Sequence, residues 1–182
     1  MSHWPADQCY QPFAVQSTSI VNYCEDVIHS SKSLWGQHMG WKASPLSMTN
    51  ILKEPVLAQV HERFPIANAG ILTMPPHRSY FWHTDETRGV SINMLLTGEH
   101  TSHCLFGQRV DNDNIDFMEL KYQPNTFYLF NTQWPHSVYN FDKHRFLFSI
   151  EFVQSKSELN YQQISKWMKE QLLIQTPPTS TA

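Results

Sequence analysis

The chain has 182 residues, of which 41% are hydrophobic, 13% aromatic and only 16% charged. This composition suits one compact domain with a single core, and it excludes a charge-rich disordered chain. The formal charge of −3 and the scattered lysines and arginines offer no basic surface for a phosphate backbone, so we expect no nucleic-acid partner. No apolar run reaches the roughly 18 residues that span a bilayer, and the polar start resembles no secretory signal. We therefore expect no membrane partner and a cytoplasmic location.

Cysteine chemistry is not expected to organise this protein. Cys9, Cys24 and Cys104 are odd in number and widely spaced, without a Cys-x-x-Cys pair. This pattern argues against a disulfide framework and a thiolate zinc site, and it predicts three reduced, partly buried thiols. Ten histidines, by contrast, are many for a chain of this size. Histidine is both a common metal ligand and an acid or base near neutral pH, so chemistry is expected there.

The first third of the chain, about residues 1–66, is predicted to be mainly helical and to support the rest. Over residues 18–31 apolar side chains recur at helical spacing behind a Ser or Thr cap candidate. A second helical stretch is predicted to open at Ser44, with a proline in its first turn. Pro55 interrupts that stretch, and another apolar stripe follows it over residues 56–64.

The middle of the chain, residues 69–153, reads as an antiparallel sandwich or barrel. Short β-branched and aromatic runs alternate there with turn residues. Eight strands are predicted, at residues 69–74, 79–85, 89–97, 103–110, 115–122, 126–131, 136–140 and 145–153. The expected core is an eight-stranded jelly roll.

The end of the chain is predicted to add one supporting helix, over about residues 155–175, capped by Ser155 or Ser157. Its apolar face should carry Tyr161, Ile164, Met168 and Leu172. Residues 176–182 form a small polar tail that is expected to fray. The whole chain, 1–182, is thus expected to be a single mainly β domain with flanking helices.

One ordered set of residues indicates a metal site. His83 and Asp85 form a His-x-Asp motif at the end of the second predicted strand, where residues two apart point to the same face. A later strand begins with His136, which offers a third ligand. Two imidazoles and one carboxylate suit Fe(II), because they fill three corners of an octahedron and leave three open. A structural zinc site would instead be closed by four protein ligands.

An iron site that uses a 2-oxo acid as cosubstrate also needs a positive charge for the far carboxylate of that acid. Arg145 is the candidate to supply this charge. Arg145 opens the last predicted strand, where apolar residues alternate with a more polar face that carries the arginine. The planar guanidinium binds a carboxylate through two parallel hydrogen bonds. Arg88 is the rival candidate for this anchoring role, and a surface salt bridge is the alternative for Arg145.

This order of motifs resembles the signature of the 2-oxoglutarate and Fe(II)-dependent oxygenase superfamily. The narrower texture around residues 75–77 and 88–96 is similar to small aspartyl/asparaginyl hydroxylases and prolyl hydroxylases. The resemblance implies a double-stranded β-helix with His83 and Asp85 on the second core strand, His136 on the seventh and Arg145 on the eighth. It also implies Fe(II), 2-oxoglutarate and O2, with hydroxylation of a small molecule, amino acid or peptide side chain and release of succinate and CO2.

Three further residues are candidates to hydrogen-bond the cosubstrate, namely Asn93, Tyr80 and Tyr128, although each also suits an ordinary strand residue. Two other functions stay open.

The first alternative is a cupin-like metalloenzyme, such as an isomerase or a dioxygenase that uses no oxo acid. Residues 135–140 also resemble the second cupin motif, which supports this alternative. A non-catalytic jelly-roll binding protein is the other.

Overall fold

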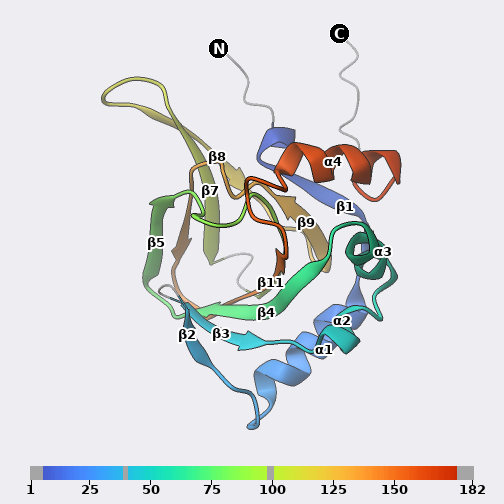
Figure 1. The fold of residues 1–182 in the computed structure, drawn as a ribbon. Coiled ribbons are helices and arrows are strands. Elements are labelled where there is room, and N and C mark those ends of the chain that lie inside the picture. Colours follow the sequence, from blue (N-terminus) through green and yellow to red (C-terminus); the bar gives the residue numbers. More distant parts are fainter. Residues whose placement is uncertain (1–5, 39–40, 98–100, 176–182) are drawn as a thin grey trace.

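The structure is a computed structural model, and it describes residues 6–38, 41–97 and 101–175. Within these ranges two antiparallel sheets face each other, and the helices lie outside the larger one (Figure 1). The larger sheet has seven strands in the order β1-β9-β6-β11-β4-β3-β2, and the smaller has four in the order β5-β10-β7-β8. This is the double-stranded β-helix, or jelly roll, that the sequence predicts.

The strands are β1 (Tyr10–Gln16), β2 (Gly36–His38), β3 (Trp41–Pro45), β4 (Ile66–Met74), β5 (Arg78–His83), β6 (Ser91–Thr97), β7 (Ser102–Arg109), β8 (Ile115–Leu120), β9 (Thr126–Phe130), β10 (His136–Asn140) and β11 (Arg145–Phe152). The helices are the short 3-10 helix η1 (Ala6–Gln8), α1 (Thr18–His29), α2 (Met48–Ile51), α3 (Pro55–Arg63) and α4 (Tyr161–Glu170). All eight predicted strands are present as β4 to β11, and their ends differ from the prediction by at most three residues.

The two faces of β11 show how the larger sheet separates core from cavity. Phe148 and Ile150 point to the outer face and are fully buried against the helices. Leu147 and Ser149 point to the inner face and line a cavity between the sheets, as Arg145 does. This alternation follows from the two-residue period of a strand and was predicted from the sequence.

The helices cover the outer face of the larger sheet, and residues at their N-termini favour the start of a helix. Ser17 caps α1 by accepting a hydrogen bond from the amide of Ile20 at 3.3 Å. Pro55 occupies the first turn of α3, where its missing N–H removes no helical hydrogen bond. No helix among residues 6–38, 41–97 and 101–175 has the length and apolar character needed to cross a membrane.

The prediction of a mainly helical first third, residues 1–66, is wrong in part, because three strands lie there. β1 pairs with β9, and β3 joins the sheet between β2 and β4. Ser44 lies in β3 opposite Ile71 instead of opening a helix, and the next helix starts behind Ser47. Pairing with strands distant in sequence determines that these segments are strands, because their local hydrophobic patterns indicate neither helix nor strand strongly.

The last helix is shorter than predicted. It begins at Tyr161, where Asn160 forms a capping box with Gln163, and not at Ser155 or Ser157. Tyr161, Ile164 and Met168 are buried as expected. Leu172 is 80% exposed and lies beyond the helix, with a φ of 58°. The predicted tail, 176–182, lies outside the described residues.

The three cysteines are free and buried, as predicted. Burial is the main cause that raises their thiol pKa values, to about 12 for Cys9 and Cys24 and to about 11 for Cys104. A raised pKa keeps a thiol protonated at neutral pH, and the thiolate is the reactive form.

We therefore expect slow alkylation of the native protein at pH 7–8 and rapid reaction of all three thiols after unfolding in urea. Mass spectrometry of samples quenched at increasing times after iodoacetamide addition measures both rates. Native Cys104 faces the cavity and should be the first to react as the pH rises toward its pKa. Fast labelling of native Cys9 or Cys24 would contradict the burial of these side chains.

Candidate metal centre and cavity

Two histidines meet across a pair of antiparallel strands. β5 ends at His83 and β10 begins at His136, and these two residues are paired directly in the register of the smaller sheet. Their ring centroids are 4.2 Å apart. Cross-strand neighbours share a face, so both rings reach the same space.

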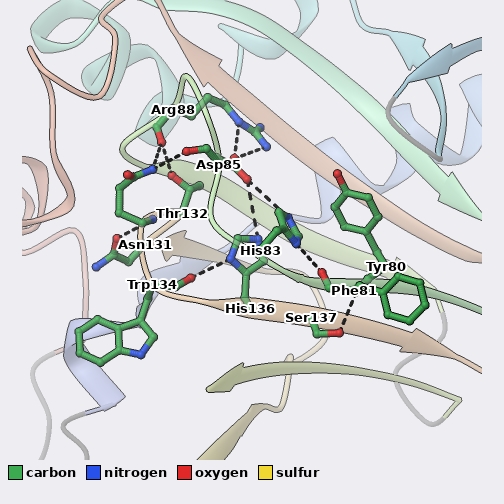
Figure 2. A network of polar contacts seen from close by, with 11 residues as sticks. Tyr80, Phe81, His83, Asp85, Arg88, Asn131, Thr132, Trp134, His136 and Ser137 are labelled. Carbon is green, nitrogen blue, oxygen red and sulfur yellow. Dashed lines mark hydrogen bonds and ion pairs between the residues drawn. The ribbon is translucent and has the colours of Figure 1, made fainter. Parts of the chain in front are cut away.

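Asp85 completes the cluster from the loop that follows β5. Its Oδ1 atom lies 3.7 Å from Nε2 of His83 and 3.8 Å from Nε2 of His136 (Figure 2). One ligand atom from each of the three side chains lies within 4.8 Å of the others, a spacing that could hold a metal ion. The structure thus brings together the His-x-Asp motif and His136, as the sequence predicts.

Backbone carbonyls set the tautomer of both rings. Nδ1 of His83 lies 2.7 Å from the carbonyl oxygen of Phe81, and Nδ1 of His136 lies 2.9 Å from that of Trp134. A carbonyl only accepts, so each Nδ1 carries the proton and donates it. In the neutral ring Nε2 then keeps its lone pair, which is the form that binds a metal.

Burial keeps His136 neutral. Its side chain is 9% exposed, and desolvation is the main cause that lowers its pKa to about 4, with the nearby His83 and Arg88 acting in the same direction. The hydrogen bond to Trp134 and the charge of Asp85 oppose this shift. At neutral pH the ring is therefore a ready ligand that needs no deprotonation before binding.

Arg88 holds the other carboxylate oxygen of Asp85. Its Nη2 and Nε atoms lie 2.6 Å and 2.7 Å from Oδ2 (Figure 2). This contact leaves Oδ1 as the oxygen that faces the histidines. Arg88 was the rival candidate for anchoring a cosubstrate, and its guanidinium is instead committed to Asp85.

The loop that carries Asp85 is hydrogen-bonded to the segment that precedes His136. The hydroxyl of Thr132 donates to the carbonyl of Arg88 at 2.6 Å, and Nε2 of Gln133 lies within hydrogen-bonding distance of the carbonyls of Asp85 and Arg88. The amide of Asp85 in turn donates to the carbonyl of Thr132 at 2.9 Å. The segment before His136 thereby fixes where Asp85 lies, a role that sequence analysis missed.

The cluster opens into a cavity of about 320 Å³ between the two sheets. Arg145 lines this cavity and is 1% exposed, and its Nε and Nη1 atoms have no hydrogen-bond partner. Its guanidinium lies 5.5 Å from the ring centre of Trp41 and 5.9 Å from that of Tyr122. A buried arginine with unpaired N–H groups is costly unless an anion binds it, so the cavity is suited to an anionic ligand.

Tyr122 also lines the cavity, and sequence analysis missed it. Its hydroxyl hydrogen-bonds Arg145, and burial raises its pKa, which keeps the phenol neutral. The residue lies two positions after the end of β8, so its place near the arginine depends on how that strand ends.

The other predicted cosubstrate residues divide into two groups. Tyr80 and Asn93 line the cavity, and Asn93 is 6% exposed, with an Oδ1 atom that has no partner. Tyr128 is not among the lining residues. Its hydroxyl accepts from the amide of Gln123 at 2.9 Å and lies 3.4 Å from the carbonyl of Lys121, so it stabilises the turn before β9.

No fourth histidine, cysteine, aspartate or glutamate joins the cluster among the described residues. Two neutral nitrogen donors and one carboxylate on one side of a cavity leave coordination positions free for small ligands. A closed structural zinc site would require a fourth protein ligand.

Neither a protein-family model nor a curated protein matches the sequence. Solved structures share the fold. A Trichoplax adhaerens prolyl hydroxylase in complex with a hypoxia-inducible-factor peptide fragment gives a TM-score of 0.56 at 14% identity, over 79% of this chain and 82% of that one. A Pseudomonas putida prolyl-4-hydroxylase gives 0.55 at 12% identity, over 80% and 92%. The non-heme α-ketoglutarate-dependent carbocyclase SnoK from nogalamycin biosynthesis gives 0.52 at 14% identity, over 82% and 81%.

At such identities the likeness is one of fold. The chain has the double-stranded β-helix that these α-ketoglutarate-dependent enzymes and prolyl hydroxylases share, and it resembles the 2-oxoglutarate and Fe(II)-dependent oxygenases in this respect. The resemblance in fold agrees with the resemblance in motifs.

The cluster should bind one divalent ion per chain, measured by calorimetric titration of Mn(II) or Co(II) into the metal-free protein. His136→Ala should weaken that affinity by more than about 100-fold, because loss of a ligand exceeds the 10–100-fold typical of residues behind the ligands. His103→Ala is the control, since this ring pairs with Glu119 and is not among the cavity residues. Unchanged affinity in His136→Ala would contradict the ligand assignment.

Proposed function

We propose that the protein is a 2-oxoglutarate and Fe(II)-dependent oxygenase that hydroxylates a C–H bond of a small molecule, an amino acid or a peptide. The observation that carries this proposal is the buried guanidinium of Arg145, whose Nε and Nη1 atoms lack partners, in the same cavity as His83, Asp85 and His136. A metal site and a fixed positive charge in one enclosed space suit a ligand with two acidic ends.

His83, Asp85 and His136 are the proposed Fe(II) ligands. The donor set fits this metal because both imidazoles present Nε2 and the carboxylate supplies one negative charge. When bound together, Fe(II), 2-oxoglutarate and O2 supply oxidative decarboxylation to succinate and CO2, coupled to oxidation of a substrate C–H bond.

Arg145 is the proposed anchor for the far carboxylate of 2-oxoglutarate. Its charge is permanent, and its Nε and Nη1 atoms have no partner, so N–H groups remain to donate to a carboxylate. Tyr122 fixes the guanidinium from the side, and the Trp41 ring covers it. Tyr80 and the amide nitrogen of Asn93 are further candidates to contact the cosubstrate, as the sequence suggests.

Hydroxylation is the outcome favoured here because two of the structural neighbours are prolyl hydroxylases, one of them with a bound peptide fragment. The same fold also serves a carbocyclase. The protein's own contribution to either outcome is to hold the substrate carbon in place and exclude water.

The proposal is tested by anaerobic titration of the Fe(II) protein with 2-oxoglutarate. Bidentate chelation is expected to produce a weak visible charge-transfer band, and admission of O2 should release succinate. Arg145→Gln should weaken 2-oxoglutarate binding by about 30-fold or more, as expected when a buried charge loses its partner. Arg145→Lys keeps the charge but loses the planar fork, so an intermediate loss is expected.

Arg109→Gln is the matched control, since this exposed arginine lies in the β7–β8 hairpin outside the cavity. Thermal unfolding and Mn(II) affinity should show that each variant is folded. Absence of the band in metal-loaded wild-type protein, or full 2-oxoglutarate affinity in folded Arg145→Gln, would refute the proposal.

A separate prediction concerns Arg88, which holds Oδ2 of Asp85 and leaves Oδ1 to the metal. In Arg88→Ala both oxygens are free, so Asp85 can bind in bidentate fashion and occupy a position that 2-oxoglutarate needs. We expect Mn(II) affinity no lower than wild type, because a nearby positive charge is lost, with 2-oxoglutarate affinity reduced about 10-fold. Calorimetry on the metal-free and the Mn(II)-loaded protein separates the two effects, and a large loss of Mn(II) affinity would contradict this role.

A further inference from the structure

A second cavity adjoins the metal cavity. A neighbouring hollow of about 300 Å³ lies along β3, β4 and β11, and four residues line both spaces. These shared residues are Leu72, Arg88, Ser149 and Glu151. Glu151 and Arg145 are six residues apart on β11, which corresponds to about 20 Å of strand. Glu151 therefore stands at the opposite end of the metal cavity from the buried guanidinium.

The two cavities are lined by more carboxylates than arginines. Among the described residues that line the two spaces, the arginines are Arg88 and Arg145 and the carboxylates are Asp85, Glu86 and Glu151. Arg88 is committed to Asp85. Glu151 forms no ion pair among the described residues, and its carboxylate accepts a hydrogen bond from Nδ2 of Asn68 at 3.3 Å. An unbalanced carboxylate thus remains at the junction, and the exposed Glu86 also lines the metal cavity.

Asn93 provides an independent observation. Its side chain is 94% buried in the cavity wall, and its Oδ1 atom has no hydrogen-bond donor. It lies opposite Ser149 in the β6–β11 pairing, and Glu151 follows two residues later on the same face. A dianionic 2-oxo acid brings only acceptors, so it cannot satisfy this oxygen. The missing donor has to come from another ligand or from water.

We propose that the junction of the two cavities recognises a protonated amino group of the substrate, with Glu151 as its counter-ion and Asn93 Oδ1 accepting a second N–H or O–H donor. This inference rests on the proposed oxygenase function and names the class of substrate. Fe(II) and the 2-oxoglutarate dianion cancel in formal charge, and Arg145 is engaged at the far end. The loaded site therefore stays negative at the junction of the two cavities, which favours a cation there.

An ammonium group has two sources, the free α-amino group of an amino acid or the side chain of a basic residue in a peptide. Two ligand pairs separate them. N-acetyl-lysine amide and N-acetyl-norleucine amide differ only by the side-chain ammonium. Norleucine amide and N-acetyl-norleucine amide form the second pair, because only norleucine amide carries the α-ammonium group. Binding is measured under nitrogen on protein loaded with Mn(II) and 2-oxoglutarate, through the relaxation of ligand protons in NMR, which also reports proximity to the metal.

In wild-type protein one ammonium source should bind about 10-fold more tightly than its neutral counterpart, the effect of a half-buried charge pair. If the side chain is recognised, N-acetyl-lysine amide exceeds N-acetyl-norleucine amide. If the α-amino group is recognised, norleucine amide exceeds N-acetyl-norleucine amide. Glu151→Gln should reduce the preference to less than about 3-fold, and Glu86→Gln should have a smaller effect because the residue is exposed.

Glu62→Gln is the control, since this exposed glutamate of α3 is outside both cavities. Thermal unfolding and Mn(II) affinity verify that Glu151→Gln is folded. No binding by any ammonium probe, equal binding within both pairs, or a preference that persists in Glu151→Gln overturns the inference. Failure of the oxygenase proposal is seen separately, as absence of 2-oxoglutarate binding, and the ligand pairs are then compared on protein with Mn(II) alone.

Discussion

A positive charge buried without an anion is the constraint on which this structure depends. Arg145 is 1% exposed and two of its nitrogen atoms lack partners, which is unfavourable in a core unless a ligand supplies the missing charge. The fold tolerates the charge because β11 is in the centre of the larger sheet, where β4 and β6 hold its backbone on both sides. The strand therefore keeps the guanidinium at a fixed place opposite the metal ligands.

The three proposed metal ligands are positioned by two different kinds of support. The pairing of β5 with β10 places His83 beside His136, and the backbone carbonyls two residues before each histidine set its tautomer. Asp85 comes from a loop, so it needs additional support, and Arg88, Thr132 and Gln133 supply it. Strands thus position the rings, whereas side-chain hydrogen bonds position the carboxylate, and the two kinds of support act on different ligands.

Much of this arrangement could be predicted from sequence because its signals are local. The alternation of β11 and the spacing of the His-x-Asp motif can be recognised within a few residues. β1 and β3 were missed because each contains proline, and they form through pairing with β9 and β4. Tyr128 could not be placed because every residue of β9 is buried and alternation identifies no face. Tyr122 and Gln133 contact residues that are distant in the sequence, so no pattern in their own segments predicts these contacts.

The position of β5 at the border of the smaller sheet has one more consequence. Among the described strands, β5 has a neighbour, β10, on one side only, yet it carries a proposed ligand at its end. An ion shared by His83 and His136 would cross-link the outermost strand to its neighbour, and binding that is specific to the native state adds to stability by mass action. Amide hydrogen exchange along the border should therefore slow on metal loading, so that occupancy and local rigidity rise together.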